Sequence, residues 1–185
     1  MEILQTPRLR LRELRETDAD ALHQVLGDPV AMSAYEHGFD RDETQEWIAR
    51  QRQRYAADGF GLWAMELRTT GEVIGDCGIT RQSNGDREVL EVGYHLVRRE
   101  WGRGLATEAA RGCVSWAFDH TGTDDVYAIV RDTNLASMNV AIRLGMTVRT
   151  REVRHYRGVE MPHLAFAITR RDWDTGTVPP SQTPG

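Results

Sequence analysis

The segment from residue 87 to residue 130 restricts the fold more than any other part of the chain. It begins with an apolar strand pattern, "REVLEVGYHLV" at 87–97, and passes through a glycine-containing turn into a helix pattern at about 105–119. The short β-branched run "DVYAIV" at 125–130 is typical of a buried strand. A strand–helix–strand unit connects parallel neighbours in a sheet, so this segment predicts one parallel strand pair.

Hairpin patterns lie on both sides of that unit. "FGLWAMEL" and "EVIGDCGIT" flank a Thr-Thr-Gly turn, and an Asn-Gly turn at 84–85 leads into the strand at 87–97. At the other end of the chain, "VRTREVRHY" and "MPHLAFAIT" are strand patterns joined by "RGVE". Because hairpins pair antiparallel strands, the sheet is predicted to be mixed and mostly antiparallel.

The other elements complete the predicted order β-α-α-β-β-β-α-β-α-β-β. The strand pattern "RLRLREL" precedes a helix that Thr17 or Asp18 can cap, and a second helix ends at Gly59. "NLASMNVAIRLGM" predicts a short helix. We therefore predict an α+β fold in a single domain at 1–173, followed by a disordered tail at 174–185 that is poor in apolar residues.

Composition limits the partners and the cellular setting. The chain has 23 basic and 28 acidic residues, a formal net charge of −5, which argues against a nucleic-acid-binding surface. Cys77 and Cys113 lie far apart in apolar stretches, which is typical of a reducing compartment. We see neither a signal peptide nor a run of about 20 apolar residues, so we expect a cytoplasmic protein. The histidines show no ligand spacing, so no metal site is predicted.

The turn before the third helix pattern is a candidate binding site. Gly-x-Gly occurs at 59–61 and at 102–104, and 17 glycines in 185 residues make about one or two such triplets expected by chance. "GFG" leads into a strand, whereas "GRG" opens a helix, where backbone N–H groups and the helix dipole favour an anion. Two interpretations stay open, a phosphate site or a tight connection with solvated arginines. Thr107 in the place of a third glycine excludes a dinucleotide fingerprint, and no P-loop is present.

A second sequence pattern, about thirty residues further on, helps to choose between these interpretations of the turn. "RREWGRG" fits Arg/Gln-x-x-Gly-x-Gly/Ala through Arg99, Gly102 and Gly104, and "NLASMNVAIRLGM" fits Asn-x-x-Ser followed by Leu-Gly-Phe, with Met146 in place of Phe. Together they resemble the acetyl-CoA signatures of the GNAT family of N-acetyltransferases. "TPRLRLREL", "EVGYHLVRREWGRGLATEA" and "TRRDW" resemble its RimJ/RimL-like branch, the ribosomal-protein alanine N-acetyltransferases, over about residues 6–173. The resemblance implies a GNAT-type acyl-CoA N-acyltransferase fold with helices on both faces of the sheet.

The resemblance also implies how acetyl-CoA is held. In the family, backbone N–H groups of the glycine turn bind the pyrophosphate, and the end of the preceding strand pairs with the pantetheine arm in a slot between two separating parallel strands. The Asn-x-x-Ser segment contacts CoA near the thioester. Asn139 stands where basic residues are common in this branch, and Arg143 is either an adenosine-phosphate contact or a solvated arginine. The implied contacts are Leu96, Val97, Arg99, Trp101, Gly102, Arg103, Gly104, Leu105, Ala106, Thr107, Asn134, Ser137, Asn139 and Arg143.

The implied reaction is direct attack of an amine on the thioester within a ternary complex. Cys77 could instead carry the acetyl group, although a buried structural cysteine is the commoner case. The candidates for the base are Glu91, acting through a water, and His95, with water alone as a third interpretation. Ser137 is the candidate acid, with Tyr94 behind it, and a purely structural role for Ser137 stays open.

The acceptor is expected to be a primary amine on a protein N-terminus or on a small molecule such as an amino acid, a polyamine or an antibiotic. At pH 7 about one in ten α-amines is neutral, far more than for lysine, so an α-amine demands less of the base. Two alternatives stay open, an inactive acyl-CoA-binding or sensor module on the same fold, and a different nucleotide-binding fold. No membrane partner is expected, and a homodimer through the final hairpin is compatible with the strand pattern.

Overall fold

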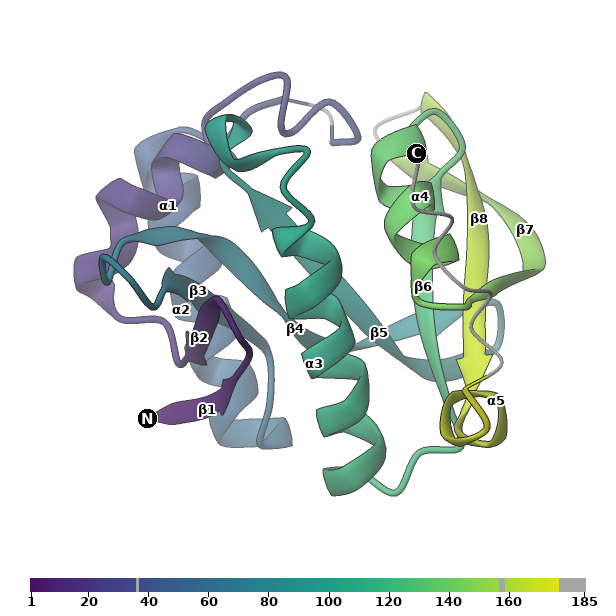
Figure 1. Cartoon of the computed structure of the whole chain (residues 1–185). Coiled ribbons are helices and arrows are strands. Elements are labelled where there is room, and N and C mark those ends of the chain that lie inside the picture. Colours follow the sequence, from purple (N-terminus) through teal and green to yellow (C-terminus); the bar gives the residue numbers. More distant parts are fainter. Residues whose placement is uncertain (36, 157–158, 177–185) are drawn as a thin grey trace, which may run out of the picture. The chain divides into compact units, whose positions relative to one another are not determined.

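The computed structural model describes residues 1–35, 37–156 and 159–176. Figure 1 shows the helices and strands in chain order. The strands are β1 (Glu2–Gln5), β2 (Leu9–Arg12), β3 (Leu62–Leu67), β4 (Val73–Asn84), β5 (Arg87–Leu96), β6 (Asp125–Arg131), β7 (Thr147–Tyr156) and β8 (Val159–Thr169). The helices are η1 (Glu16–Asp18), α1 (Ala19–Leu26), α2 (Arg41–Asp58), η2 (Arg98–Glu100), α3 (Leu105–His120), α4 (Leu135–Arg143) and α5 (Arg170–Asp174).

The observed order contains every predicted element and adds four short ones, β1 and α5 at the ends and the 3-10 helices η1 and η2. None of the four was visible as a periodic pattern, because each is only three to five residues long. The final hairpin is tighter than predicted, since β8 already begins at Val159. The link at 157–158 and the end of the predicted tail at 177–185 lie outside the described residues.

Among the described residues, eight strands form one sheet in the order β1-β2-β3-β4-β5-β6-β8-β7. β5 and β6 are parallel, with Glu91 opposite Tyr127. The pairs β1–β2, β2–β3, β3–β4, β6–β8 and β7–β8 are antiparallel. The prediction of a mixed and mostly antiparallel sheet is therefore confirmed.

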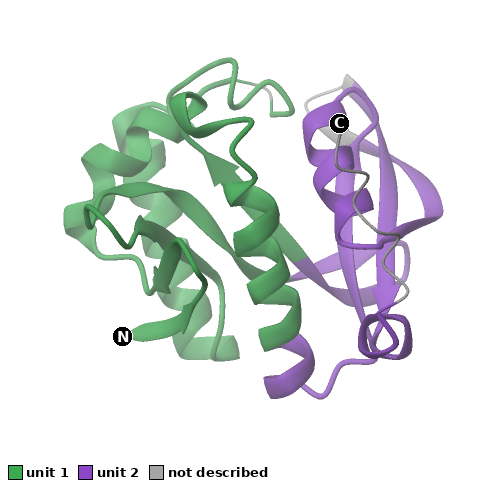
Figure 2. Cartoon of the chain, in the orientation of Figure 1, with its two compact units in different colours: residues 1–80, 92–116 green, residues 81–91, 117–185 purple. Residues whose placement is uncertain are grey.

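The chain divides into two compact units, which Figure 2 colours separately. The first unit comprises residues 1–80 and 92–116. Its helix α2 is capped at the start by Asp40, whose carboxylate accepts the amide of Glu43 at 2.8 Å, and at the end by Gly59 with a φ of 81°. An apolar core cluster of this unit is formed by side chains of α1, α2, β3 and nearby loops, namely Leu14, Leu22, Leu26, Met32, Trp47, Ile48, Leu62 and Ala64.

The second unit comprises residues 81–91 and the rest of the chain from 117 onward. Its core is formed by Val89 on β5, Tyr127 on β6, and Ala165 and Ala167 on β8. The amide of Arg170, the first residue of α5, donates to the carbonyl of Asp124 at 2.8 Å. None of the helices in the described residues combines the length and the apolar content needed to cross a bilayer.

Candidate functional site

The turn between β5 and α3 depends on two glycines for its backbone conformation. Gly102 has a φ of 75° and Gly104 a φ of 74°, which residues with a side chain rarely adopt. A Cβ added at Gly102 would meet no atom within 4 Å, so conformation rather than packing within the protein requires glycine there. Leu105 then begins α3, a helix of 16 residues.

The backbone N–H groups of this turn are available to a ligand. Within the described part of the chain, the amides of residues 102–107 donate no hydrogen bond, and the first of the helical series runs from Glu108 N to Gly104 O at 3.0 Å. The first turn of any helix leaves such donors without an intrahelical acceptor. Six consecutive amides at the positive end of a helix dipole form a suitable site for a phosphate or another anion.

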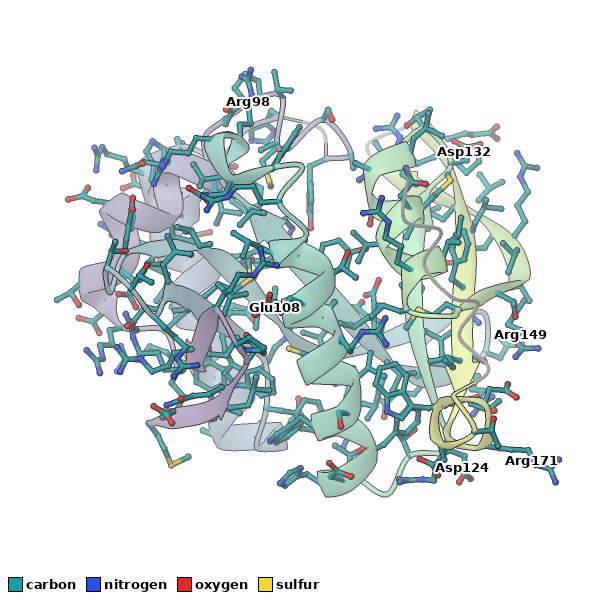
Figure 3. All side chains as sticks on the ribbon, in the orientation of Figure 1. Arg98, Glu108, Asp124, Asp132, Arg149 and Arg171 are labelled. Atoms are coloured by element: carbon teal, nitrogen blue, oxygen red, sulfur yellow. The ribbon has the colours of Figure 1, made fainter. Side chains whose placement is uncertain are left out.

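The arginines of the turn are engaged with the protein itself. Arg98, which Figure 3 labels ahead of α3, donates to Asp28 at 3.4 Å. Every arginine of the turn is paired with a carboxylate: Arg98 with Asp28, Arg99 with Glu72, and Arg103 with Glu100. The local positive charge is therefore largely balanced, and the backbone amides are the main anion-binding groups of the turn.

Arg8, just before β2, holds the turn in place from outside. Its guanidinium donates to Arg103 O at 2.8 Å and to the Glu108 carboxylate at 2.6 Å. Glu108, labelled on α3 in Figure 3, also accepts the Thr6 hydroxyl at 2.6 Å. Burial alone raises the pKa of the Glu108 carboxyl, but the hydrogen bonds from Thr6 and Arg8 outweigh it and hold the pKa below its ordinary value. Glu108 is thus an ionised anchor at neutral pH.

The end of β5 leads directly into the turn. Leu96 and Val97 are both buried, and the amide of Val97 donates to Ile74 O on β4 at 2.9 Å. The indole of Trp101 donates to the carbonyl of Leu96 at 2.7 Å, although the Trp101 side chain is half exposed. One lone pair of the Leu96 carbonyl is therefore already engaged by the turn itself.

Glu91, a candidate base, makes a backbone contact where β5 and β6 are parallel. Its carboxylate accepts the amide of Ile129 at 2.9 Å, two residues beyond Tyr127, which lies opposite Glu91 in the sheet. In a regular parallel ladder that amide would donate to a main-chain carbonyl. A side chain in that position is expected where two neighbouring strands begin to separate.

His95, the other candidate base, contacts residues that sequence reasoning did not select. Its Nδ1 lies 2.7 Å from a carboxylate oxygen of Asp76, and its Nε2 lies 2.8 Å from the hydroxyl of Tyr35. Asp76 is fully buried on β4 and also accepts the indole N–H of Trp47 at 2.8 Å. A carboxylate inside the apolar run "VIGDCGI" was the one sequence signal that could have identified Asp76.

The second predicted signature forms the start of α4. Asn134 is the N-cap residue, and its side-chain oxygen accepts the amide of Ser137 at 3.1 Å. The two residues of the signature are therefore in contact with each other through a capping bond. Ser137 is partly buried, whereas Asn139 and Arg143 are exposed on the helix.

Comparison with known proteins decides the family. A family model described as an acetyltransferase (GNAT) domain matches residues 8–147 of the chain. This chain is a member of the GNAT acetyltransferase family. YkkB of Bacillus subtilis (strain 168) is 37% identical to this acetyltransferase over 144 residues, which cover 77% of this chain and 84% of YkkB.

Solved structures confirm the GNAT fold. A GNAT-family acetyltransferase from Bacillus anthracis has a TM-score of 0.79 and 19% identity, with 92% of this chain and 99% of that chain covered. RimL, described as a ribosomal L7/L12 alpha-N-protein acetyltransferase in complex with coenzyme A, has a TM-score of 0.72 and 16% identity, with 91% and 98% covered. The likeness to the RimJ/RimL-like branch is therefore confirmed for the fold.

The two cysteines of this acetyltransferase are buried next to each other. Cys77 and Cys113 are buried free thiols with their sulfurs 3.5 Å apart. Burial and the neighbouring Cys113 raise the pKa of the Cys77 thiol well above its ordinary value, which disfavours the nucleophilic thiolate. Across the described residues, no three His, Cys, Asp or Glu side chains are grouped to hold a metal ion.

Removal of the Arg8 side chain tests its hold on the glycine turn. In Arg8→Met, Arg103 O and Glu108 each lose a donor, so the turn is less well ordered and the Kd for CoA is expected to rise about three- to tenfold. Isothermal titration calorimetry with CoA measures it. Arg68→Met is the matched control. Arg68 donates to the carbonyls of Thr6 and Pro7, the two residues before Arg8, and makes no such bond to the glycine turn in the described structure. An equal loss in both variants would contradict a specific role for Arg8.

Proposed function

We propose that this chain binds acetyl-CoA at the glycine turn and transfers its acetyl group directly to a primary amine, preferably an α-amine. The observation that carries the proposal is the run of backbone amides at 102–107, which donate no hydrogen bond within the described part of the chain. Gly102 and Gly104, two residues of this run, have positive φ. That run suits the pyrophosphate of CoA, and membership of the GNAT family supplies the chemistry of the thioester. RimL, similar in fold, is described as an α-N-protein acetyltransferase in complex with coenzyme A, which supports the choice of donor and acceptor.

The residues of the chain would divide the work of holding the donor. The amides of the turn would bind the pyrophosphate, while Leu96 and Val97 at the end of β5 would present their backbone to the pantetheine arm. Glu91 would help to keep β5 and β6 apart through its bond to Ile129. Once the donor is fixed, catalysis is mainly a matter of positioning the amine and handling two protons.

Ser137 is the proposed acid for the leaving thiolate. Ser137→Ala removes the hydroxyl but leaves the backbone amide that Asn134 caps, so α4 should keep its N-terminus. We expect kcat to fall at least about tenfold while the Kd for acetyl-CoA changes much less. Steady-state kinetics together with calorimetry separates the two quantities. Equal losses in kcat and in acetyl-CoA affinity would assign Ser137 to binding alone.

A panel of amines tests the proposed function. An alanine-initiated peptide, alaninamide, spermidine and Nα-acetyl-lysine are each incubated with acetyl-CoA, and free thiol release and product mass are measured. We expect release with the α-amines to exceed release with Nα-acetyl-lysine, because more of an α-amine is neutral at pH 7.

Two other outcomes would replace the proposal. Tight binding of acetyl-CoA without thiol release for any amine would indicate an acyl-CoA sensor. Thermal stabilisation by NAD or ATP in preference to CoA would indicate a different nucleotide ligand at the glycine turn.

A further inference from the structure

The first observation is a buried carboxylate with both oxygens engaged. Asp76 has no exposed surface; one oxygen lies 2.7 Å from Nδ1 of His95 and the other 2.8 Å from the indole nitrogen of Trp47. An indole N–H can only donate, so the second oxygen accepts. A carboxylate buried in this way needs such partners, because an unpaired buried charge is strongly unfavourable.

The hydrogen bonds fix the tautomer of His95. A carboxylate accepts only, so the proton of the neutral imidazole lies on Nδ1 and points at Asp76. Nε2 then carries a lone pair, and the hydroxyl of Tyr35, 2.8 Å away, donates to it. The chain of bonds runs in one direction, from Tyr35 through His95 to Asp76.

The same three residues lead from the surface to the interior of the first unit. Tyr35 is 38% exposed, the His95 side chain 11% and Asp76 0%. The His95 ring lies between the rings of Tyr35 and Trp47, each with its centroid 5.5 Å away. The imidazole is thus held by packing as well as by hydrogen bonds, and only Tyr35 offers a well-exposed polar end.

The position of His95 relates this chain of bonds to the glycine turn. His95 is the last residue but one of β5, and Val97, η2 and the glycine turn follow directly. A Cβ added at Gly75 on β4 would lie 2.0 Å from the carbonyl oxygen of His95. The absent side chain at Gly75 therefore lets β4 approach the backbone of β5 closely and sets the position of His95.

We propose that Tyr35, His95 and Asp76 form the proton-accepting chain for the acceptor amine, with Tyr35 as the catalytic residue that meets the amine and Asp76 and Trp47 as positioning residues. This inference rests on the proposed acetyl transfer. The amine nitrogen forms a bond to the carbonyl carbon, and the carbon–sulfur bond breaks with its electron pair leaving on the thiolate of CoA. The surplus amine proton passes to the Tyr35 oxygen as the Tyr35 proton passes to Nε2 of His95. The thiolate takes a proton from Ser137, which regains one from solvent. The imidazolium formed at His95 faces Asp76 and then gives its proton to solvent.

Three substitutions test the proton-accepting chain, one at each of its three residues. His95→Gln is expected to lower kcat about 100-fold or more, because it removes the final acceptor. Tyr35→Phe keeps the ring contact with His95 but removes the hydroxyl, and Asp76→Asn lets the other imidazole tautomer form, so each should lower kcat at least about tenfold. The KM for acetyl-CoA should stay within about threefold of the wild-type value. A variant with a merely structural defect would be expected to change this KM as well as kcat. Should Asp76→Asn fail to fold, Tyr35→Phe tests the same chain from the surface.

His37→Gln is the matched control. His37 also pairs with a carboxylate, Glu43, at 2.9 Å, but it is exposed and takes no part in the chain. This variant should keep the kcat of the wild type. Nitrogen-15 NMR of the labelled wild-type protein should show the proton of neutral His95 on Nδ1, and Asp76→Asn should lose that preference.

The outcomes separate this inference from the proposed function. A wild type that acetylates an amine of the panel, together with an unchanged kcat in His95→Gln or Tyr35→Phe, would overturn the proton-accepting chain alone. A proton on Nε2 of neutral His95 would also overturn it. A wild type that releases no thiol with any of the four amines would overturn the proposed function and this inference together.

Discussion

Replacement of Arg12 by methionine is expected to lower the free energy of unfolding by about 3–5 kcal/mol at pH 7. Arg12 donates to both oxygens of Asp18, at 2.7 and 2.8 Å, and also to Glu66. All three side chains are less than a tenth exposed. Among the described residues, the variant leaves Asp18 with only the amide of Arg15 as a hydrogen-bond partner, and Glu66 with only Arg10. Urea denaturation measures the loss.

The pH dependence follows from the two carboxylates. Burial by itself raises the pKa of Asp18, but the hydrogen bonds from Arg12 and Arg15 outweigh it, and the pKa lies below its ordinary value. The same balance, with Arg10 and Arg12 as donors, lowers the pKa of Glu66. A lowered pKa in the folded state stabilises the protein above the pKa of the unfolded chain, about 4, and this contribution is lost as pH falls through the folded value.

Without Arg12, we expect the pKa shift of Asp18 to change direction, from lowered to raised, because burial then dominates and disfavours the charged carboxylate. The difference in unfolding free energy between wild type and Arg12→Met should therefore be largest at pH 7 and shrink toward pH values of about 4. Arg41→Met is the control, because its pair with Asp20 is exposed and should contribute little. A difference that stays constant with pH would show that the loss comes from packing rather than from charge.

Local patterns were sufficient to predict most of the elements. Glycine turns and period-two alternation predicted the hairpins, and the strand–turn–helix pattern predicted the parallel pair. The predicted end of α2 at Gly59 is confirmed by its φ of 81°. At Asp18, however, other nearby partners replace the expected capping bond: the carboxylate binds the side chain of Arg12 and the amide of Arg15, and it makes no capping bond to α1.

The candidate site was predictable only where backbone chemistry defines it. The turn at Gly102 and Gly104 was visible because positive φ requires glycine, and the structure shows both. The contacts of Arg8 with Arg103 and Glu108 join positions about 100 residues apart. Such a pairing has no local signature, and neither does the contact of His95 with Tyr35, which lies 60 residues away in a loop.

Gly102→Ala is expected to weaken CoA binding at least about tenfold, equivalent to about 1.4 kcal/mol. The methyl group would enter space that is open in the protein. A loss of CoA affinity larger than the backbone strain explains would therefore come from contact between the methyl group and the bound CoA. Alanine at a φ of 75° also strains the backbone, by about 1–2 kcal/mol. Calorimetry with CoA measures the affinity, and urea denaturation measures the strain.

Gly59→Ala separates these two effects. Gly59 has a φ of 81°, and a Cβ there would likewise meet no atom within 4 Å, but it ends α2 rather than opening α3. Both variants should lose similar stability, because both place alanine in the left-handed region. Only Gly102→Ala should lose affinity for CoA if the amides at 102–107 bind the pyrophosphate. Equal CoA affinity in the two variants would mean that the turn is a structural connection and that the donor binds elsewhere.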